Sequence, residues 1–525
     1  QKSFANDLSA SEFFEGKLKK DDDFGARDRI NRAPKSLGFV QLKPTIQLTD
    51  AGKQFVYGKR ENEIFTRQLL KFQFPSPYHV DKNDDYFIRP YLELFRLIYE
   101  LDGLTKDEIA IFFTECIHID KYEMVKGKIL EFRKKKKELD RKKTNYNRFF
   151  RKVFDEQLEI IYSKQISERN FKTRESGEKS LKKFLSTKRN NHMDYADAAI
   201  RYLRNTLLVT LQPRTYKVVI AEDKIKEVEF LLKNTKREPL IFNSEEDYQN
   251  YLFDASIPLL YPDNPDRIIE EIKSHVMDDD IDINIDELVY KDVEELKDIK
   301  EEIIRDKVDK SITDQVLNLQ TYKEHDDVQS VYEDILTGDV VDKPLFLEWN
   351  TWRGFTMLND GKIQGNFRVD DNGMPLSTAG GNMPDILCKY SNFDMLVEVT
   401  MSKGARQYET EGEPVARHVG MHKRSTDKET YCIFIAPSLN QATIAHFFAL
   451  HKIDIEFYGG KSKIIPMTIN DFRKMLEVAY LADEKPDSDT ILRFLEKHSE
   501  GALISTNEEI WYKGIKDSIP NWMVS

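Results

Sequence analysis

Two acidic residues thirteen positions apart have the types and the spacing that could do chemistry. Asp385 follows a proline, and Glu398 lies inside the apolar run 395–399, which is typical of a buried strand. An ionised carboxylate in such a strand is costly unless a cation meets it, and a divalent metal ion shared with Asp385 is the simplest partner. The alternative is an aspartate in a turn and a glutamate on an edge strand, a pattern that arises by chance in many proteins.

The spacing of this acidic pair fits a hairpin, which would bring both carboxylates to one point. Hard oxygen ligands of this kind suit Mg²⁺, which binds few protein carboxylates together with waters and phosphate oxygens. Such an ion polarises a phosphate, activates water and stabilises the leaving oxygen. We therefore expect Mg²⁺ as the cofactor, with Mn²⁺ able to replace it.

The elements around this pair alternate between helices and short apolar strands. Helices are predicted at 328–336, 344–358, 440–450 and 470–481, and strands at 386–387, 395–400, 431–435 and 463–467. This order predicts an α/β domain with a central mixed sheet and helices on both faces.

The N-terminal half shows a different pattern, which occurs twice. Residues 23–55 predict a helix, two short strands around the turn at Lys43-Pro44-Thr45, and a helix that Thr49 can cap. Residues 193–232 repeat the order around a turn at 212–214. Helix, hairpin and helix resemble a winged helix-turn-helix, so we expect a DNA-recognition region with two winged-helix-like subdomains.

The distribution of charge supports a division into regions. Residues 1–250 hold 50 Lys and Arg against 40 Asp and Glu, whereas 251–350 hold 10 against 28. A basic region can neutralise DNA phosphates, and an acidic one predicts a spacer that stays away from DNA. The residues expected to contact DNA are Arg27, Arg29, Arg32, Lys35, Lys188, Arg189 and Arg201.

The composition limits the classes of protein to which the chain can belong. Its 525 residues are 40% hydrophobic, enough for about two to four domains that each have a core. No apolar run approaches the roughly 20 residues needed to cross a bilayer. Cys116, Cys388 and Cys432 lie far apart, without metal-ligand spacing. This favours a reducing cytoplasm and argues against structural zinc.

Several motifs together resemble the AlwI family of type IIS restriction endonucleases, which includes the large chains of site-specific nicking endonucleases. They are EW at 348–349 with GF at 354–355, AGGNMPD at 379–385, EVTMSKGA at 398–405, EPV at 413–415, RH at 417–418, RDR at 27–29, GFV at 38–40 and TDAGK at 49–53. The resemblance thus extends over most of the chain, and its C-terminal block is the most specific part.

The resemblance implies a multidomain α+β protein. A winged-helix DNA-recognition region would occupy residues 1–238, an acidic helical linker 239–325, and a PD-(D/E)xK nuclease domain 326–525. Carried over residue by residue, the family's catalytic positions fall on Glu348, Asp385, Glu398 and Glu411. Of these, Asp385, Glu398 and Glu411 would bind the metal.

One position departs from the general PD-(D/E)xK pattern, which places a lysine two residues after the strand acid. Here that position is Thr400, so the usual role of the lysine is in doubt. Lys403, or the carboxylate of Glu411, could substitute for it in positioning water or metal.

The resulting expectation is a cytoplasmic bacterial endonuclease that hydrolyses double-stranded DNA at a fixed offset from a short asymmetric site. One chain would cut one strand, so cutting both would require a second copy or a small catalytic subunit. Two alternatives are a winged-helix regulator without catalytic activity and a structure-selective repair nuclease.

Overall fold

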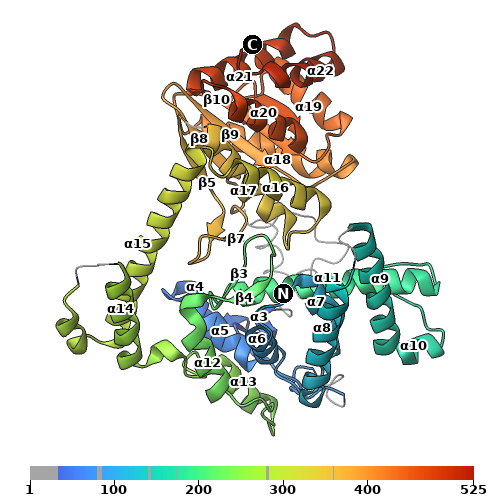
Figure 1. Cartoon of the computed structure of the whole chain (residues 1–525), viewed down its shortest axis with the longest axis vertical. Coiled ribbons are helices and arrows are strands. Elements are labelled where there is room, and N and C mark those ends of the chain that lie inside the picture. Colours follow the sequence, from blue (N-terminus) through green and yellow to red (C-terminus); the bar gives the residue numbers. More distant parts are fainter. Residues whose placement is uncertain are drawn as a thin grey trace. The chain divides into compact units, whose positions relative to one another are not determined.

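A computed structural model describes residues 33–79, 85–139, 143–173, 175–279, 283–358 and 360–524 (Figure 1). The chain divides into two compact units, Gln1–Ile303 and Ile304–Ser525, which we call unit 1 and unit 2. Part of the predicted linker, 239–325, falls in each unit, and the division into three regions stays a prediction. The predicted helix at 26–32, with Arg27, Arg29 and Arg32, lies outside the described residues.

The first predicted hairpin of unit 1 is present but short. Strands β1 (Val40–Gln41) and β2 (Gln47–Leu48) pair antiparallel, after helix α3 (Ala33–Ser36) and before α4 (Asp50–Tyr57). The Thr49 side chain accepts a hydrogen bond from the Gly52 backbone and so caps α4, as predicted. A Cβ on Gly52 would lie 2.0 Å from the Phe39 carbonyl oxygen, so only glycine allows this hairpin and helix to approach so closely.

The second hairpin consists of β3 (Val209–Leu211) and β4 (Val218–Ile220), again antiparallel. It follows the long helix α11 (Leu181–Arg204) and precedes α12 (Ile225–Asn234). The predicted order of helix, strand, turn, strand and helix is therefore confirmed here.

Among the described residues, six α-helices lie between α4 and α11 in the chain. They are α5 (Glu61–Lys71), α6 (Pro90–Glu100), α7 (Lys106–Phe112), α8 (Tyr122–Lys137), α9 (Lys143–Ile161) and α10 (Ser163–Ser167). Thr105 and Glu108 have the spacing that predicts a capping box, and the structure confirms it at the start of α7. Arg133, in the basic run of α8, donates hydrogen bonds to Glu108 and to the carbonyls of Leu101 and Gly103. Arg133, at least, therefore joins α8 to α7 and to the turn before α7.

A buried histidine makes the stability of unit 1 depend on pH. His192 on α11 is 2% exposed and contacts the hydroxyls of Thr114 and Tyr162 through its two ring nitrogens. Burial lowers the pKa of His192 to about 4.

We expect this histidine to destabilise the fold in acid. Between pH 6.5 and 4 the unfolded chain binds a proton that the folded chain does not, so stability falls as the pH is lowered through this window. The loss amounts to at most about 3 kcal/mol. Urea unfolding followed by circular dichroism should show a shallower decline for His192→Gln than for the wild type. His118→Gln, at a histidine whose side chain is 37% exposed beside Asp120, serves as the control, and equal slopes for His192→Gln and the wild type would contradict the assignment.

The acidic middle folds into helices, and its longest one differs from the prediction. The elements are α13 (Glu245–Phe253), η5 (Tyr261–Asp263), α14 (Pro265–Asp279), η6 (Ile285–Tyr290) and α15 (Val293–Gln320). The sequence predicts a charged helix at 286–308, whereas α15 begins later, at Val293, and continues to Gln320. A core of Ile268, Ile272, Leu288 and Leu296 packs α14, η6 and the first turns of α15 together.

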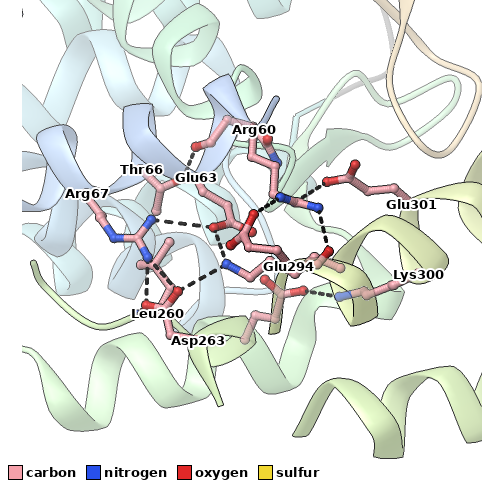
Figure 2. Close-up of polar contacts among 12 residues, drawn as sticks. Arg60, Glu63, Thr66, Arg67, Leu260, Asp263, Glu294, Lys300 and Glu301 are labelled. Carbon is pink, nitrogen blue, oxygen red and sulfur yellow. Dashed lines mark hydrogen bonds and ion pairs between the residues drawn. The ribbon is translucent and has the colours of Figure 1, made fainter. Parts of the chain in front are cut away.

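Ion pairs hold the start of α15 within unit 1 (Figure 2). The guanidinium of Arg60, only 8% exposed, contacts the carboxylates of Glu294, Asp298 and Glu301. Glu294 and Asp298 are four residues apart, a spacing that predicts repulsion between them along a helix, but Arg60 contacts both carboxylates and neutralises them.

Two buried lysines of α15 make similar contacts. Lys297 pairs with Glu63 at 2.7 Å and Asp263 at 3.2 Å, and Lys300 pairs with Glu227 at 3.1 Å and Glu271 at 2.6 Å. Much of the acidic charge thus joins helices, in addition to any effect that it has on DNA.

Unit 2 is built on a mixed sheet, as predicted, and this sheet has five strands, of which the one at 362–365 was not predicted. The strand order is β11-β10-β9-β8-β5. The strands β9, β10 and β11 run parallel, whereas β8 and β5 are antiparallel to their neighbours. Their bounds are β5 Lys362–Gly365, β8 Ile386–Lys389, β9 Phe393–Val399, β10 Glu429–Ala436 and β11 Lys463–Thr468.

Helices pack on this sheet in two pairs. One pair is α17 (Lys343–Leu358) with α20 (Ile469–Leu481), and the other is α18 (Ala405–Lys423) with α19 (Gln441–Lys452). The remaining elements are α16 (His325–Thr337), β6 (Arg368–Val369), β7 (Pro375–Ser377), η7 (Glu456–Tyr458), α21 (Ser488–Ile504), α22 (Glu508–Ser518) and η8 (Ile519–Asn521). None of the described helices is long and apolar enough to cross a membrane.

Candidate functional site

The sheet register brings Asp385 and Glu398 together. Strands β8 and β9 pair antiparallel with Ile386 opposite Val397, so one step further the register aligns Asp385 with Glu398. The Val399 backbone N–H donates to Oδ2 of Asp385 at 2.7 Å. The thirteen-residue spacing therefore does what the hairpin interpretation requires, because both acids lie at the same end of one strand pair.

Glu348 reaches the same place from helix α17, which packs on β9. Its carboxylate accepts a hydrogen bond from the Ala379 N–H at 2.9 Å, which ties it to the loop before Asp385. The side chain is buried, 6% exposed. The predicted helix therefore does deliver its acid to the strand pair.

Glu411 comes from the first half of helix α18. Its Oε1 accepts a hydrogen bond from the Thr400 hydroxyl at 2.7 Å, just after the end of β9. Lys403 lies exposed in the loop between β9 and α18. Of the two proposed substitutes for the missing lysine, Glu411 is thus bonded to the residue at that position.

Helix α18 also brings His418 and Arg417 to the site. The Nδ1 atom of His418 lies 2.8 Å from Oε1 of Glu398, and Arg417 hydrogen-bonds to the Asn382 side chain in the loop before Asp385. Because His418 lies seven residues after Glu411, two helical turns place both on one face of α18. That spacing is the signal that could have assigned His418 to the site.

Electrostatics tie the four acids into one cluster. Burial and the charge of Asp385 raise the pKa of Glu348 to about 8. Burial and the charges of Glu398 and Glu411 hold the pKa of Asp385 well above its usual range. Burial, together with Glu411 and Glu348, has the same effect on the pKa of Glu398. Each of the three is thus penalised for ionising in the presence of its neighbours.

The chemistry of this donor set fits a divalent cation. Buried carboxylates that oppose one another's ionisation lose that penalty when a cation lies among them, and oxygen ligands suit Mg²⁺. Within the described ranges, no three His, Cys, Asp or Glu side chains stand close enough together to form a ready-made ligand group. Each acid is tied instead to its own hydrogen-bond partner.

Helix α17 precedes the β8–β9 pair in the chain and α18 follows it, and each contributes one carboxylate to the cluster. A mixed sheet with such a cluster of carboxylates defines a candidate hydrolase of phosphate esters. The family comparison makes this class specific. The model of the AlwI restriction endonuclease family matches residues 35–475, so the chain belongs to that family. The resemblance expected from the sequence motifs is confirmed.

Two solved structures are similar to parts of the chain. The small subunit of the heterodimeric restriction endonuclease R.BspD6I is 26% identical, with 37% of this chain and 98% of that chain covered and a TM-score of 0.33. The BpuJ1 endonuclease binding domain, solved with pyrene- and phenanthrene-modified DNA, is 16% identical, with 48% and 86% covered and a TM-score of 0.29. Scores this low establish no common architecture. No curated protein sequence matches the chain.

The described residues that were predicted to contact DNA all have partners within unit 1. The Lys35 ammonium lies over the Tyr78 ring, 4.3 Å from its centre, and Lys188 lies over Tyr162 at 4.6 Å. Arg189 pairs with Asp155, and Arg201 pairs with Asp197 at 3.1 Å. Their role in DNA binding stays a prediction.

Proposed function

We propose that this chain, a restriction endonuclease by family, hydrolyses one phosphodiester bond of double-stranded DNA at a fixed offset from a short asymmetric site, with Mg²⁺ as its cofactor. The observation that supports the proposal best is the cluster of Glu348, Asp385, Glu398 and Glu411 at one end of the β8–β9 pair, in which Glu348 and Glu398 are buried. We assign recognition of the DNA sequence to the two winged-helix-like segments of unit 1.

The roles proposed for this site come from the family's pattern, and the placement of the side chains is compatible with them. Asp385, Glu398 and Glu411 would hold the Mg²⁺, and when bound this ion polarises the phosphate and lowers the pKa of water. Glu348, anchored by the Ala379 N–H, adds a fourth carboxylate beside them. Its pKa near 8 lets it hold a proton at neutral pH until a cation arrives. Lys403, exposed in the loop between β9 and α18, would help to position water or the metal.

Cleavage of both strands requires more than one such cluster. The described part of the chain carries one such cluster, so we infer that a single chain nicks DNA. A double-strand break then requires a second copy or a small catalytic subunit. The ratio of nicked to linear plasmid, measured over a range of protein concentrations, separates these cases, since only a self-associating enzyme yields more linear product as its concentration rises.

Selection followed by cleavage mapping tests the proposed function. Duplexes bound from a randomised library are sequenced and then incubated with the protein and Mg²⁺. We expect one short asymmetric sequence, with the cut at a constant distance outside it. Enrichment without metal-dependent product would support the catalytically silent regulator instead, and cutting that follows DNA structure rather than sequence would support the repair nuclease.

Arg201 offers a test of the DNA-recognition assignment. Its side chain is 56% exposed beside Asp197, so it can exchange an intramolecular partner for a phosphate at little cost. We expect Arg201→Ala to weaken DNA binding about threefold to tenfold and to reduce the slope of log affinity against log salt by about one.

Fluorescence anisotropy at several salt concentrations measures both quantities for Arg201→Ala. Lys474→Ala, which removes an equally exposed cation paired with Glu477 in unit 2, is the matched control. An Arg201→Ala variant with the affinity and slope of the wild type would remove Arg201 from the binding surface.

A further inference from the structure

We propose that Thr400 is a positioning residue that holds the Glu411 carboxylate in the active site, and this inference rests on the proposed function. Thr400 stands two residues after Glu398, where the general nuclease pattern has a lysine. At the position where that pattern has the lysine ammonium, the Thr400 hydroxyl instead hydrogen-bonds to the Glu411 carboxylate of helix α18. The pair of Thr400 and Glu411 is thus the local replacement for the missing lysine.

The hydrogen bonds of Thr400 fix the direction of its hydroxyl proton. The Thr400 oxygen accepts from the Ser402 N–H at 3.0 Å and donates to Oε1 of Glu411 at 2.7 Å. The Thr400 backbone N–H is itself bonded to the Ile435 carbonyl of β10 at 3.0 Å. A hydroxyl has a single proton, and a carboxylate can only accept it. The side chain is also 8% exposed, so it is held on every side.

A second side chain fastens the loop that carries Ser402. Gln407 is fully buried, and its amide nitrogen donates to the carbonyls of Ser402 and Ser438 at 3.0 and 2.9 Å. Its amide oxygen accepts from the Asn440 N–H at 2.8 Å. Gly404, at φ +61°, then turns the chain into α18. Gln407 therefore anchors Ser402, the residue whose N–H donates to the Thr400 hydroxyl.

Glu411 needs such a hold, because its surroundings repel it. It is only partly buried, and its negative charge acts on both Asp385 and Glu398. A carboxylate facing two like charges would lower its energy by turning toward solvent. A charge-assisted hydrogen bond of 2.7 Å opposes that movement. The exposed Thr410 hydroxyl also lies 3.1 Å from Oε1 of Glu411, but its single proton has a closer acceptor in the Arg406 carbonyl, at 2.9 Å.

Three variants test this role. Thr400→Val keeps the shape and removes the hydroxyl, Thr400→Ser keeps the hydroxyl, and Thr410→Val removes the exposed hydroxyl of Thr410. We expect Thr400→Val to lower kcat about 10- to 100-fold while KM for DNA and the Tm change little. Thr400→Ser should lie close to the wild type, and Thr410→Val should lose less than Thr400→Val.

Two further measurements separate positioning from a loss of structure. Mn²⁺ binding to the DNA-free protein, followed by electron paramagnetic resonance, should weaken about 10- to 100-fold in Thr400→Val. In a Glu411→Gln background, Thr400→Val should cost almost nothing more, because the two residues act as a unit.

The outcomes distinguish this inference from the proposed function. Equal kcat and equal Mn²⁺ affinity in Thr400→Val and the wild type would overturn the role of Thr400 alone, and so would additive effects in the double variant or a Thr400→Ser variant as impaired as Thr400→Val. A wild type that binds Mn²⁺ without cutting DNA would refute the function but leave the Mn²⁺ comparison to decide on Thr400. A wild type that neither cuts nor binds Mn²⁺ would overturn both.

Discussion

Asp385→Asn should abolish Mg²⁺-dependent cleavage while leaving DNA binding intact. Asp385 faces Glu398 across the β8–β9 pair and takes a hydrogen bond from Val399, so the nearly isosteric amide preserves packing but removes one ligand charge. We expect a loss of at least about 1,000-fold in the rate of plasmid nicking, or about 4 kcal/mol of transition-state stabilisation.

The matched control for this variant is Glu409→Gln. Glu409 is an exposed acid on helix α18, two residues before Glu411. The Glu409→Gln variant should cut DNA within about twofold of the wild-type rate. Anisotropy on the selected duplex, with Ca²⁺ in place of Mg²⁺, verifies that both variants still bind. If Asp385→Asn cut DNA as fast as Glu409→Gln, the carboxylate cluster would not be the active site.

Arg353→Met should produce the largest loss of stability in unit 2. The guanidinium of Arg353, 2% exposed, donates to Glu324 and Asp327, both at 2.7 Å, and to the Asn350 side chain at 3.1 Å. Methionine replaces the volume but leaves two neighbouring carboxylates without their cation. Breaking a buried ion pair in this way costs about 3–5 kcal/mol, or roughly 10 °C in Tm for a unit of this size.

Tryptophan fluorescence isolates this effect. All four tryptophans of the chain lie in unit 2, so their emission during thermal unfolding follows this unit alone. Lys474→Met is the control, since Lys474 and Glu477 form an ion pair about half exposed, worth at most about 1 kcal/mol. Equal Tm values for Arg353→Met and Lys474→Met would show that the Arg353 cluster does not stabilise the unit.

The acidic pair could be predicted from sequence because its signals are local. A proline before Asp385, an apolar run around Glu398 and a hairpin-length spacing together specify one strand pair, and the sheet confirms it. The capping box at Thr105 and the order of strands and helices in unit 2 are equally local. Short-range patterns of this kind survive folding unless tertiary contacts oppose them.

Partners brought together from distant parts of the chain could not be predicted. Arg60 and Glu294 are 234 positions apart, so the sequence suggested repulsion along α15 where the fold supplies a cation. The hydrogen bond from Thr400 to Glu411 was missed for a related reason, since the motif directs attention to an absent lysine. The hydrogen bond of the Thr400 hydroxyl to Glu411 becomes visible only when the loop between β9 and α18 is folded.

The position of a bound metal ion tests the central claim most directly. Mn²⁺ scatters anomalously, so crystals of the full chain grown with Mn²⁺ reveal its site without reference to activity. We predict a peak among the carboxylate oxygens of Asp385, Glu398 and Glu411, and the loss of that peak in Asp385→Asn. A peak elsewhere, or none at this cluster in an enzyme that cuts DNA with Mn²⁺, would contradict the assignment.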